Sequence, residues 1–138
     1  MKVQSYYSSK AGNSYQIAAV IAKENSVKVD QIPPAYQPEN ERVIFISYES
    51  NFSDSKVEKF LKTLTTAKCK SVAFAIVGDD TKNLDSYKKI VSDLGIKVHD
   101  EVYQVKLGGG LFKKGKITEE HLKGALEWSH KIMDVMAG

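Results

Sequence analysis

Short runs of β-branched and aromatic residues alternate along this chain with segments in which apolar residues recur at helical spacing. The runs cover residues 3–7, 27–31, 43–47, 72–77 and 98–105. Runs of this length and composition are typical of buried strands, and the periodic segments between them are typical of helices that cover a sheet. The alternation therefore predicts repeated strand–helix units, and with them an α/β fold built on a parallel sheet.

The helices are expected where the apolar periodicity is strongest, in segments 15–23, 57–64, 84–94 and 118–136. A Ser55–Glu58 capping box precedes the second of these segments, Gly95 ends the third, and the fourth begins at Thr118. Residues 32–38 hold all 3 prolines of the chain, which excludes a regular helix there. We expect that crossover to be irregular.

The polarity of the strands predicts their order in the sheet. Segments 43–47 and 72–77 are apolar on both faces, as interior parallel strands must be, whereas 27–31 and 98–105 carry interleaved polar residues that suit edges. With right-handed crossovers, this predicts a single doubly wound domain over residues 1–138, with five parallel strands in the order 2-1-3-4-5. Gln4 and Ser5 are polar for a central strand, and a partner on a covering helix is the one explanation that the sequence offers for them.

Small and hydroxylated residues connect the first strand to the first helix. The segment reads Ser9, Lys10, Ala11, Gly12, Asn13 and Ser14. A turn of this kind leaves the first N–H groups of the helix unpaired at the positive end of the helix dipole, where an anion binds well. The alternative is an ordinary strand–helix turn in which Asn13 or Ser14 caps the helix.

Residues 9–14 resemble the phosphate-binding loop of flavodoxins, a pattern of hydroxyl residue, any residue, hydroxyl residue, Gly, Asn, hydroxyl residue placed directly after the first strand. Ala11 alone departs from this pattern. The resemblance implies a flavodoxin-like fold in which this loop holds the 5′-phosphate of FMN. It also implies that two later loops at the same edge of the sheet hold the flavin ring.

Those later loops follow the third and fourth strands. They contain Tyr48, Glu49, Ser50, Asn51 and Phe52 in one case and Gly78, Asp79 and Asp80 in the other. The Gly78-Asp79 pair resembles the Gly-Asp of the second flavin loop of flavodoxins. Because no aromatic residue follows the fourth strand, stacking on the ring would fall to Tyr48 or Phe52. Alternatively, either aromatic fastens its loop to its own helix.

The resemblance implies a short-chain, FMN-binding flavoprotein that carries electrons between redox partner proteins. Two alternatives remain open. One is a two-electron FMN-dependent oxidoreductase that acts on a small acceptor such as a quinone, since flavin enzymes of this fold can work without a catalytic side chain. The other is a flavin-free module that only docks to other proteins.

Composition argues against several other classes. The net charge is only +3 and is spread along the chain, which gives little support for nucleic-acid binding. The longest apolar run, 72–77, is too short to cross a membrane. Because the first strand begins almost at Met1, no leader is expected, and the single Cys69 suits a reducing compartment, so we expect a cytoplasmic location.

Two further patterns lack residues or spacings that the corresponding sites need. Residues 110–117 have the glycine and lysine spacing of a nucleotide P-loop, but Ile117 stands where a magnesium-binding Ser or Thr is needed. The histidines His99, His121 and His130 share no ligand spacing, so no metal site is expected.

Overall fold

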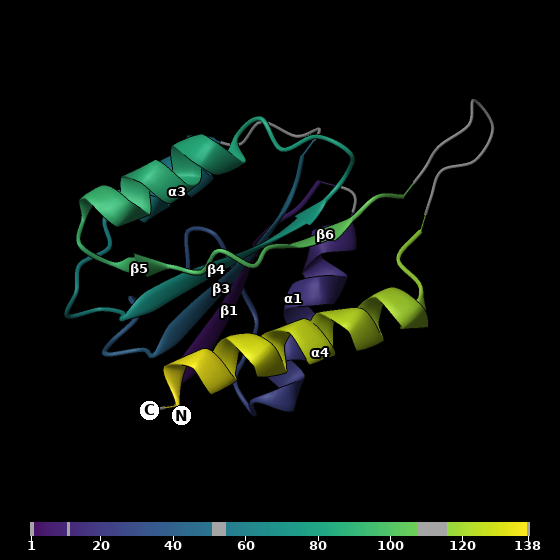
Figure 1. Cartoon of the computed structure of the whole chain (residues 1–138), viewed down its shortest axis with the longest axis horizontal. Helices are drawn as coiled ribbons and strands as arrows, with labels where there is room; N and C mark the ends of the chain where they lie inside the picture. The colour runs from purple at the N-terminus through teal and green to yellow at the C-terminus, as the bar shows by residue number, and fades with distance from the viewer. Residues whose placement is uncertain (1, 11, 51–54, 108–115, 138) are drawn as a thin grey trace.

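A parallel sheet with helices on both faces forms the protein (Figure 1). The computed structural model describes residues 2–10, 12–50, 55–107 and 116–137. The strands are β1 (Val3–Ser8), β2 (Asp30–Gln31), β3 (Val43–Glu49), β4 (Ser71–Val77), β5 (Lys97–Val98) and β6 (Tyr103–Val105). The helices are α1 (Asn13–Glu24), α2 (Ser55–Leu61), α3 (Leu84–Asp93) and α4 (Glu119–Met136).

The strands lie in the order β2-β1-β3-β4-β5, and β6 also pairs with β4. This confirms the predicted doubly wound, flavodoxin-like arrangement. The predicted fifth strand is divided: β5 pairs with the start of β4 and β6 with its end. Between these two pieces, the carbonyl of Glu101 accepts a hydrogen bond from Trp128 Nε1 at 3.0 Å, so this carbonyl points to α4.

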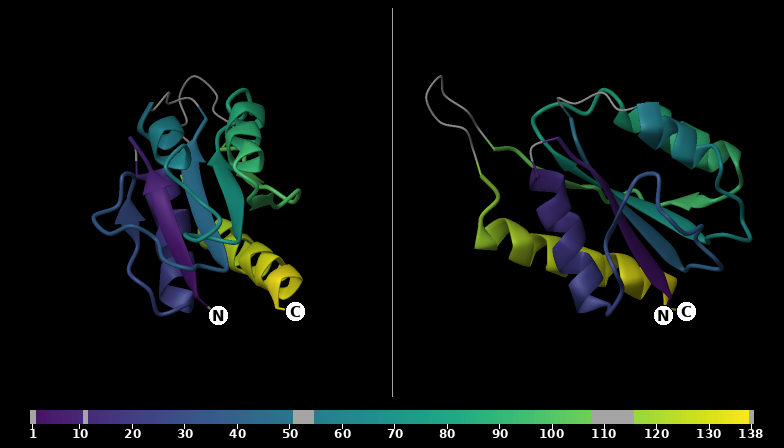
Figure 2. Two further views of the ribbon diagram at one scale, coloured as in Figure 1. Left: turned by 90° about the vertical axis from the view of Figure 1, so that its left-hand side faces the viewer. Right: turned by 180° about the vertical axis from the view of Figure 1, so that it is seen from behind.

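The helices divide between the two faces of the sheet (Figures 1 and 2). Helices α1 and α4 cover one face, where Phe45 of β3 meets Trp128 edge to face with ring centroids 5.5 Å apart. Helices α2 and α3 cover the other face, over a cluster that includes Phe60, Phe74 and Tyr87. Two of the three interior strands, β3 and β4, are buried along their whole length, as predicted, because helices cover both of their faces.

Ser5 of β1 has a partner on a covering helix, which is the explanation that the sequence offered for it. Its hydroxyl donates to the carbonyl of Ala18 in α1 at 2.7 Å, and both residues are fully buried. The bond satisfies a buried polar group and fixes α1 against β1.

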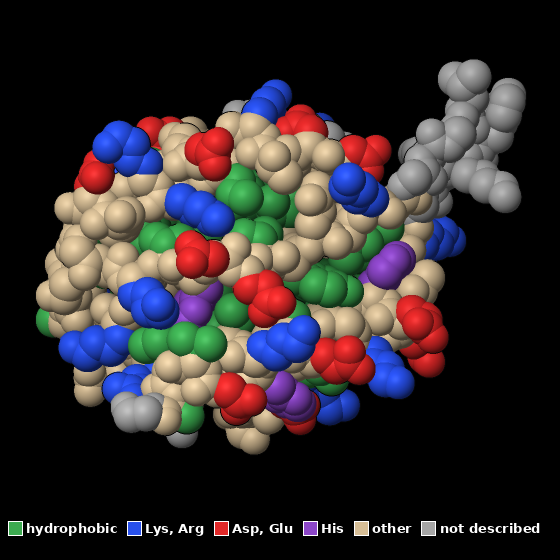
Figure 3. Space-filling view, in the orientation of Figure 1, with side chains coloured by type: hydrophobic (Ala, Val, Ile, Leu, Met, Phe, Trp, Pro, Cys, Tyr) green, Lys and Arg blue, Asp and Glu red, His purple; other side chains and the backbone are tan. Residues whose placement is uncertain are grey.

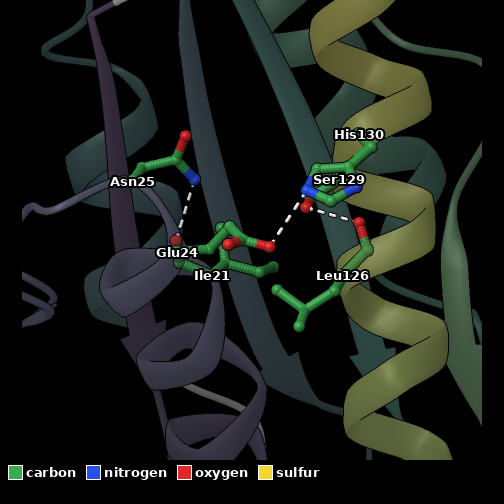
Figure 4. A network of polar contacts seen from close by, with 6 residues as sticks. All are labelled: Ile21, Glu24, Asn25, Leu126, Ser129 and His130. Carbon is green, nitrogen blue, oxygen red and sulfur yellow. Dashed lines mark hydrogen bonds and ion pairs between the residues drawn. The ribbon is translucent and has the colours of Figure 1, made fainter.

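The far end of α1 is tied to α4 (Figure 4). His130 Nε2 lies 3.0 Å from Glu24 Oε2, and the Asn25 side chain donates to the carbonyl of Ile21 at 2.8 Å. These contacts fix the C-terminal end of α1. The N-terminal end of α1 lies at the other end of this helix, next to the carboxyl end of β1.

Two predicted helix starts had different outcomes. Thr118 caps α4 as predicted: its hydroxyl accepts from the N–H of His121, and His121 Nδ1 accepts from the N–H of Thr118. The Ser55–Glu58 capping box is not formed, because α2 already begins at Ser55 and a capping residue must precede the helix. Position 54 lies outside the described residues.

Candidate functional site

The loops after β1, β3 and β4 meet at one edge of the sheet. Strand order reverses between β1 and β3, since the chain goes from β1 outward to β2 on one side and then to β3 on the other. Ligands of open α/β sheets bind beyond the carboxyl ends of the strands at such a reversal. The described ends of these three loops therefore lie at the reversal of strand order.

The loop after β1 makes a sharp left-handed turn into α1. Gly12 precedes the helix with φ of +89° and ψ of −3°, a conformation that L residues rarely adopt. Nothing lies within 4 Å of a Cβ built on Gly12, so the backbone conformation and not crowding requires glycine here. The turn aims the first N–H groups of α1 out of the sheet edge.

The carboxylate of Glu49, the last residue of β3, lies in this turn. It accepts hydrogen bonds from the backbone N–H of Lys10 at 3.2 Å and from the backbone N–H of Ser14 at 3.3 Å. The hydroxyl of Ser9 also donates to it, and Ser14 Oγ lies 3.1 Å away. The Glu49 residue is only 4% exposed. The predicted phosphate loop thus binds an anion in this structure, and the anion is a side chain of the protein itself.

The two serines also support the loop from within. Ser14 Oγ lies 2.7 Å from the carbonyl of Ser8, so its single hydrogen is shared between this carbonyl and Glu49. Ser9 Oγ accepts from the N–H of Gly12 at 2.8 Å. The hydroxyls therefore hold the loop in shape as well as pointing at the anion.

The other two loops approach each other closely. The N–H of Ser50 donates to the carbonyl of Val77 at 3.0 Å, and the N–H of Asp80 reaches Ser50 Oγ at 3.4 Å. Gly78 has φ of +134°, and its carbonyl accepts from Gln104 Nε2 at 2.8 Å. Ser50 and the Gly78 turn are therefore in direct contact, and Ser50 directly follows Glu49 in the chain.

Tyr48 does not face this edge. Its ring is buried against Tyr87 and Phe74, with centroid distances of 5.2 and 6.4 Å. Burial raises the pKa of the Tyr48 phenol far above its usual range. In this conformation Tyr48 packs against β4 and α3 and not against α2, the helix that follows its own loop, and it offers no surface for stacking.

The remaining predicted residues are distributed as follows. Asn13 is the first residue of α1, and Lys10, Asp79 and Asp80 are exposed. Ala11, Asn51 and Phe52, together with the P-loop-like residues 110–115, lie outside the described residues. The structure thus brings the loop after β1 together with Glu49, and Ser50 together with Gly78 and Asp80.

The role of Glu49 was not foreseen, although strand register carries a signal for it. Ser8 pairs with Tyr48 across β1 and β3, so Glu49 comes to lie beside Ser9 one residue further on. Given the strand order, an acidic residue one position past this pair could have been placed against the anion loop.

Two further observations concern the described residues as a whole. No group of three or more His, Cys, Asp or Glu side chains among them is arranged to hold a metal ion. None of the helices in that part of the chain has the length and apolar character needed to span a bilayer.

Solved structures of similar shape agree on the class of fold. The chain superimposes on oxidised flavodoxin 2 from Bacillus cereus with a TM-score of 0.61 and 18% identity, covering 95% of this chain and 99% of that one. It also superimposes on a flavodoxin from the domain Archaea with a TM-score of 0.69 and 15% identity, over 100% of both chains. No protein-family model and no curated protein matches the sequence. The fold is flavodoxin-like over nearly the whole chain.

Proposed function

We propose that this protein binds FMN noncovalently and transfers electrons between partner proteins. The observation that carries the proposal is the convergence of the donors of Ser9, Lys10 and Ser14 on one anionic group at the N-terminus of α1. A carboxylate and a phosphate present similar oxygen acceptors to such donors. The flavodoxin-like fold supports a flavin as the ligand of this edge.

The residues present fit the phosphate of FMN on condition that Glu49 leaves the loop. Ser9, Lys10, Gly12 and Ser14 would then hold the phosphate, as the resemblance of residues 9–14 to the flavodoxin loop implies. Ser50 and the turn at Gly78, Asp79 and Asp80 would border the ring, and their backbone groups suit its polar atoms. When bound, FMN supplies the redox chemistry, while the protein orients the flavin and sets its electrostatic surroundings.

The proposed partners are redox proteins met in the cytoplasm. On the face shown in Figure 3, acidic and basic side chains are interspersed, in keeping with a net charge of only +3. Such a surface gives weak long-range steering. We therefore expect association with a redox partner to depend less on ionic strength than it would for a strongly charged carrier.

Identification of the ligand tests the cofactor directly. The protein is purified, denatured, and the released small molecule is analysed by mass spectrometry, with added FMN used where none is recovered. We expect FMN, because the G-x-G-x-x-G that accommodates a pyrophosphate is missing after β1. FAD in stoichiometric amount would contradict the proposal, and failure to bind added FMN would leave the docking module.

The type of chemistry needs a second experiment. Absorption spectra recorded during stepwise anaerobic reduction distinguish a one-electron carrier from a two-electron oxidoreductase. Reduction in single-electron steps supports the carrier. Reduction in one two-electron step, followed by rapid reoxidation with a quinone, would favour the enzyme.

A further inference from the structure

Residues 9–14, here called the anion loop, hold the carboxylate of a residue from the neighbouring strand β3. Glu49 ends β3, where pairing with β1 sets its backbone next to Ser9. Its carboxylate accepts from the N–H groups of Lys10 and Ser14 and is almost completely buried. A buried carboxylate with several donors is stable where it is, and the positive end of α1 stabilises it further.

We propose that Glu49 determines the selectivity of this site by competing with the phosphate of any ligand for the same donors. Each N–H group donates one strong hydrogen bond, so a phosphate can use the donors of Lys10 and Ser14 only when Glu49 has left them. Two anions in one small loop also repel each other, which prevents both from staying. The phosphate group therefore adds little to the affinity of the wild-type protein for FMN.

This inference rests on the proposed function to the extent that the phosphate is that of FMN. Riboflavin carries the same ring without the phosphate and has no need to displace Glu49. The wild-type protein should accordingly bind FMN and riboflavin with similar affinity. Removal of the negative charge at position 49 should then raise the affinity for FMN and leave the affinity for riboflavin unchanged.

The chain offers a matched control at the other end of the same strand. Glu41 precedes β3, is also buried at 3% exposure, and has Lys2 Nζ at 3.9 Å from its carboxylate. Glu41→Gln removes a buried negative charge without touching the anion loop. Any effect common to both variants therefore reflects the loss of a buried carboxylate in general.

The first experiment measures flavin affinity. FMN and riboflavin are titrated against wild type, Glu49→Gln and Glu41→Gln, with flavin fluorescence as the signal. In Glu49→Gln we expect the affinity for FMN relative to riboflavin to rise about 10- to 100-fold, the range for hydrogen bonds to charged groups. In Glu41→Gln the ratio should stay within about twofold of wild type, well below that range. A ratio in Glu49→Gln that stays at the wild-type value, or falls, overturns the proposal.

The second experiment needs no flavin and separates this proposal from the proposed function. Thermal unfolding of wild type, Glu49→Ala and Glu41→Gln is followed in inorganic phosphate and in chloride of equal ionic strength. Phosphate should raise the Tm of Glu49→Ala with a saturable dependence, because it binds the emptied loop of the native state. Wild type and Glu41→Gln should respond no more than they do to chloride.

An equal change in Tm of all three proteins in phosphate would show that Glu49 does not compete with phosphate for the loop. Should none of the proteins bind a flavin while Glu49→Ala still responds to phosphate, the proposed function fails and the role of Glu49 stands.

Discussion

Ser50 Oγ occupies the space that a side chain at position 78 would need. A Cβ built on Gly78 would lie 2.0 Å from Ser50 Oγ and 3.1 Å from Ser50 Cβ, and Gly78 also has φ of +134°. The backbone conformation therefore requires glycine here, and a Cβ would in addition force the Ser50 side chain to move. The close approach joins the loop after β3 to the loop after β4.

Gly78→Ala should lower the free energy of unfolding by about 2–4 kcal/mol, because strain in the backbone adds to a steric conflict with Ser50. Gly12→Ala is the matched comparison, since Gly12 also has positive φ but nothing lies within 4 Å of its Cβ. It should cost only about 1–2 kcal/mol. Urea unfolding measures both.

The source of that difference can be checked in a double variant. Ser50→Ala removes the hydroxyl that conflicts with the new methyl group and should restore part of the stability lost in Gly78→Ala. The same replacement combined with Gly12→Ala should restore nothing. Equal costs for the two glycine variants would show that crowding at Gly78 is unimportant.

His99 should make stability depend on pH. It is buried, its Nε2 lies 2.9 Å from Ser71 Oγ, and burial together with the Lys97 cation lowers the pKa of the imidazole below its usual 6.5. Because the pKa of His99 is lower in the folded protein, the unfolded chain takes up the proton at a higher pH than the folded chain does. Stability is therefore full above pH 6.5 and falls on acidification below it, by up to about 1.4 kcal/mol per pH unit.

The measurement for His99 is the free energy of unfolding between pH 8 and 5, in wild type and His99→Gln. We expect the difference between the two proteins to shrink as pH falls below 6.5, since the variant lacks the group that titrates. A difference that stays constant over this range would contradict the assignment.

Lys10 is expected to add a charge-assisted contact to the ligand phosphate. The backbone N–H of Lys10 already donates to the Glu49 carboxylate, and the Lys10 side chain is exposed. In the Glu49→Gln background, where the loop is open to the phosphate, Lys10→Ala should weaken FMN binding by about 1–3 kcal/mol while riboflavin binding hardly changes. Calorimetric titration with both flavins measures this, and an equal loss for both would indicate distortion of the loop instead.

Cys69 should be inert in the native protein. The thiol is fully buried, and burial together with nearby Glu41 raises its pKa to about 11. A thiol of this kind is protonated at pH 8 and reacts poorly. We expect no reaction with a disulfide reagent at pH 8 until denaturant is added, followed by one equivalent of released chromophore; rapid reaction of the native protein would refute the burial.

Much of the architecture followed from local pattern. The apolar runs of β3 and β4 identified two of the three interior strands, because helices cover both faces of these strands. A partner for Ser5 on a covering helix and the start of α4 at Thr118 were also expected, since both satisfy backbone or hydroxyl groups close to elements already predicted. The break between β5 and β6 was not foreseen; within it, the Glu101 carbonyl accepts a hydrogen bond from Trp128, a residue far along the chain.

The sequence by itself determined the strand order, the anion loop at residues 9–14 and the edge of the sheet at which that loop lies. Those features depend on periodicity, on residue type and on the right-handedness of strand–helix–strand connections. Only the tertiary structure decided which anion fills the loop and which way Tyr48 faces. The register between β1 and β3 brings Glu49 beside Ser9, and the packing of β3 beside β4 and under α3 places Tyr48 against Phe74 and Tyr87. Register is a relationship between distant segments, so it is fixed by packing and not by either segment alone.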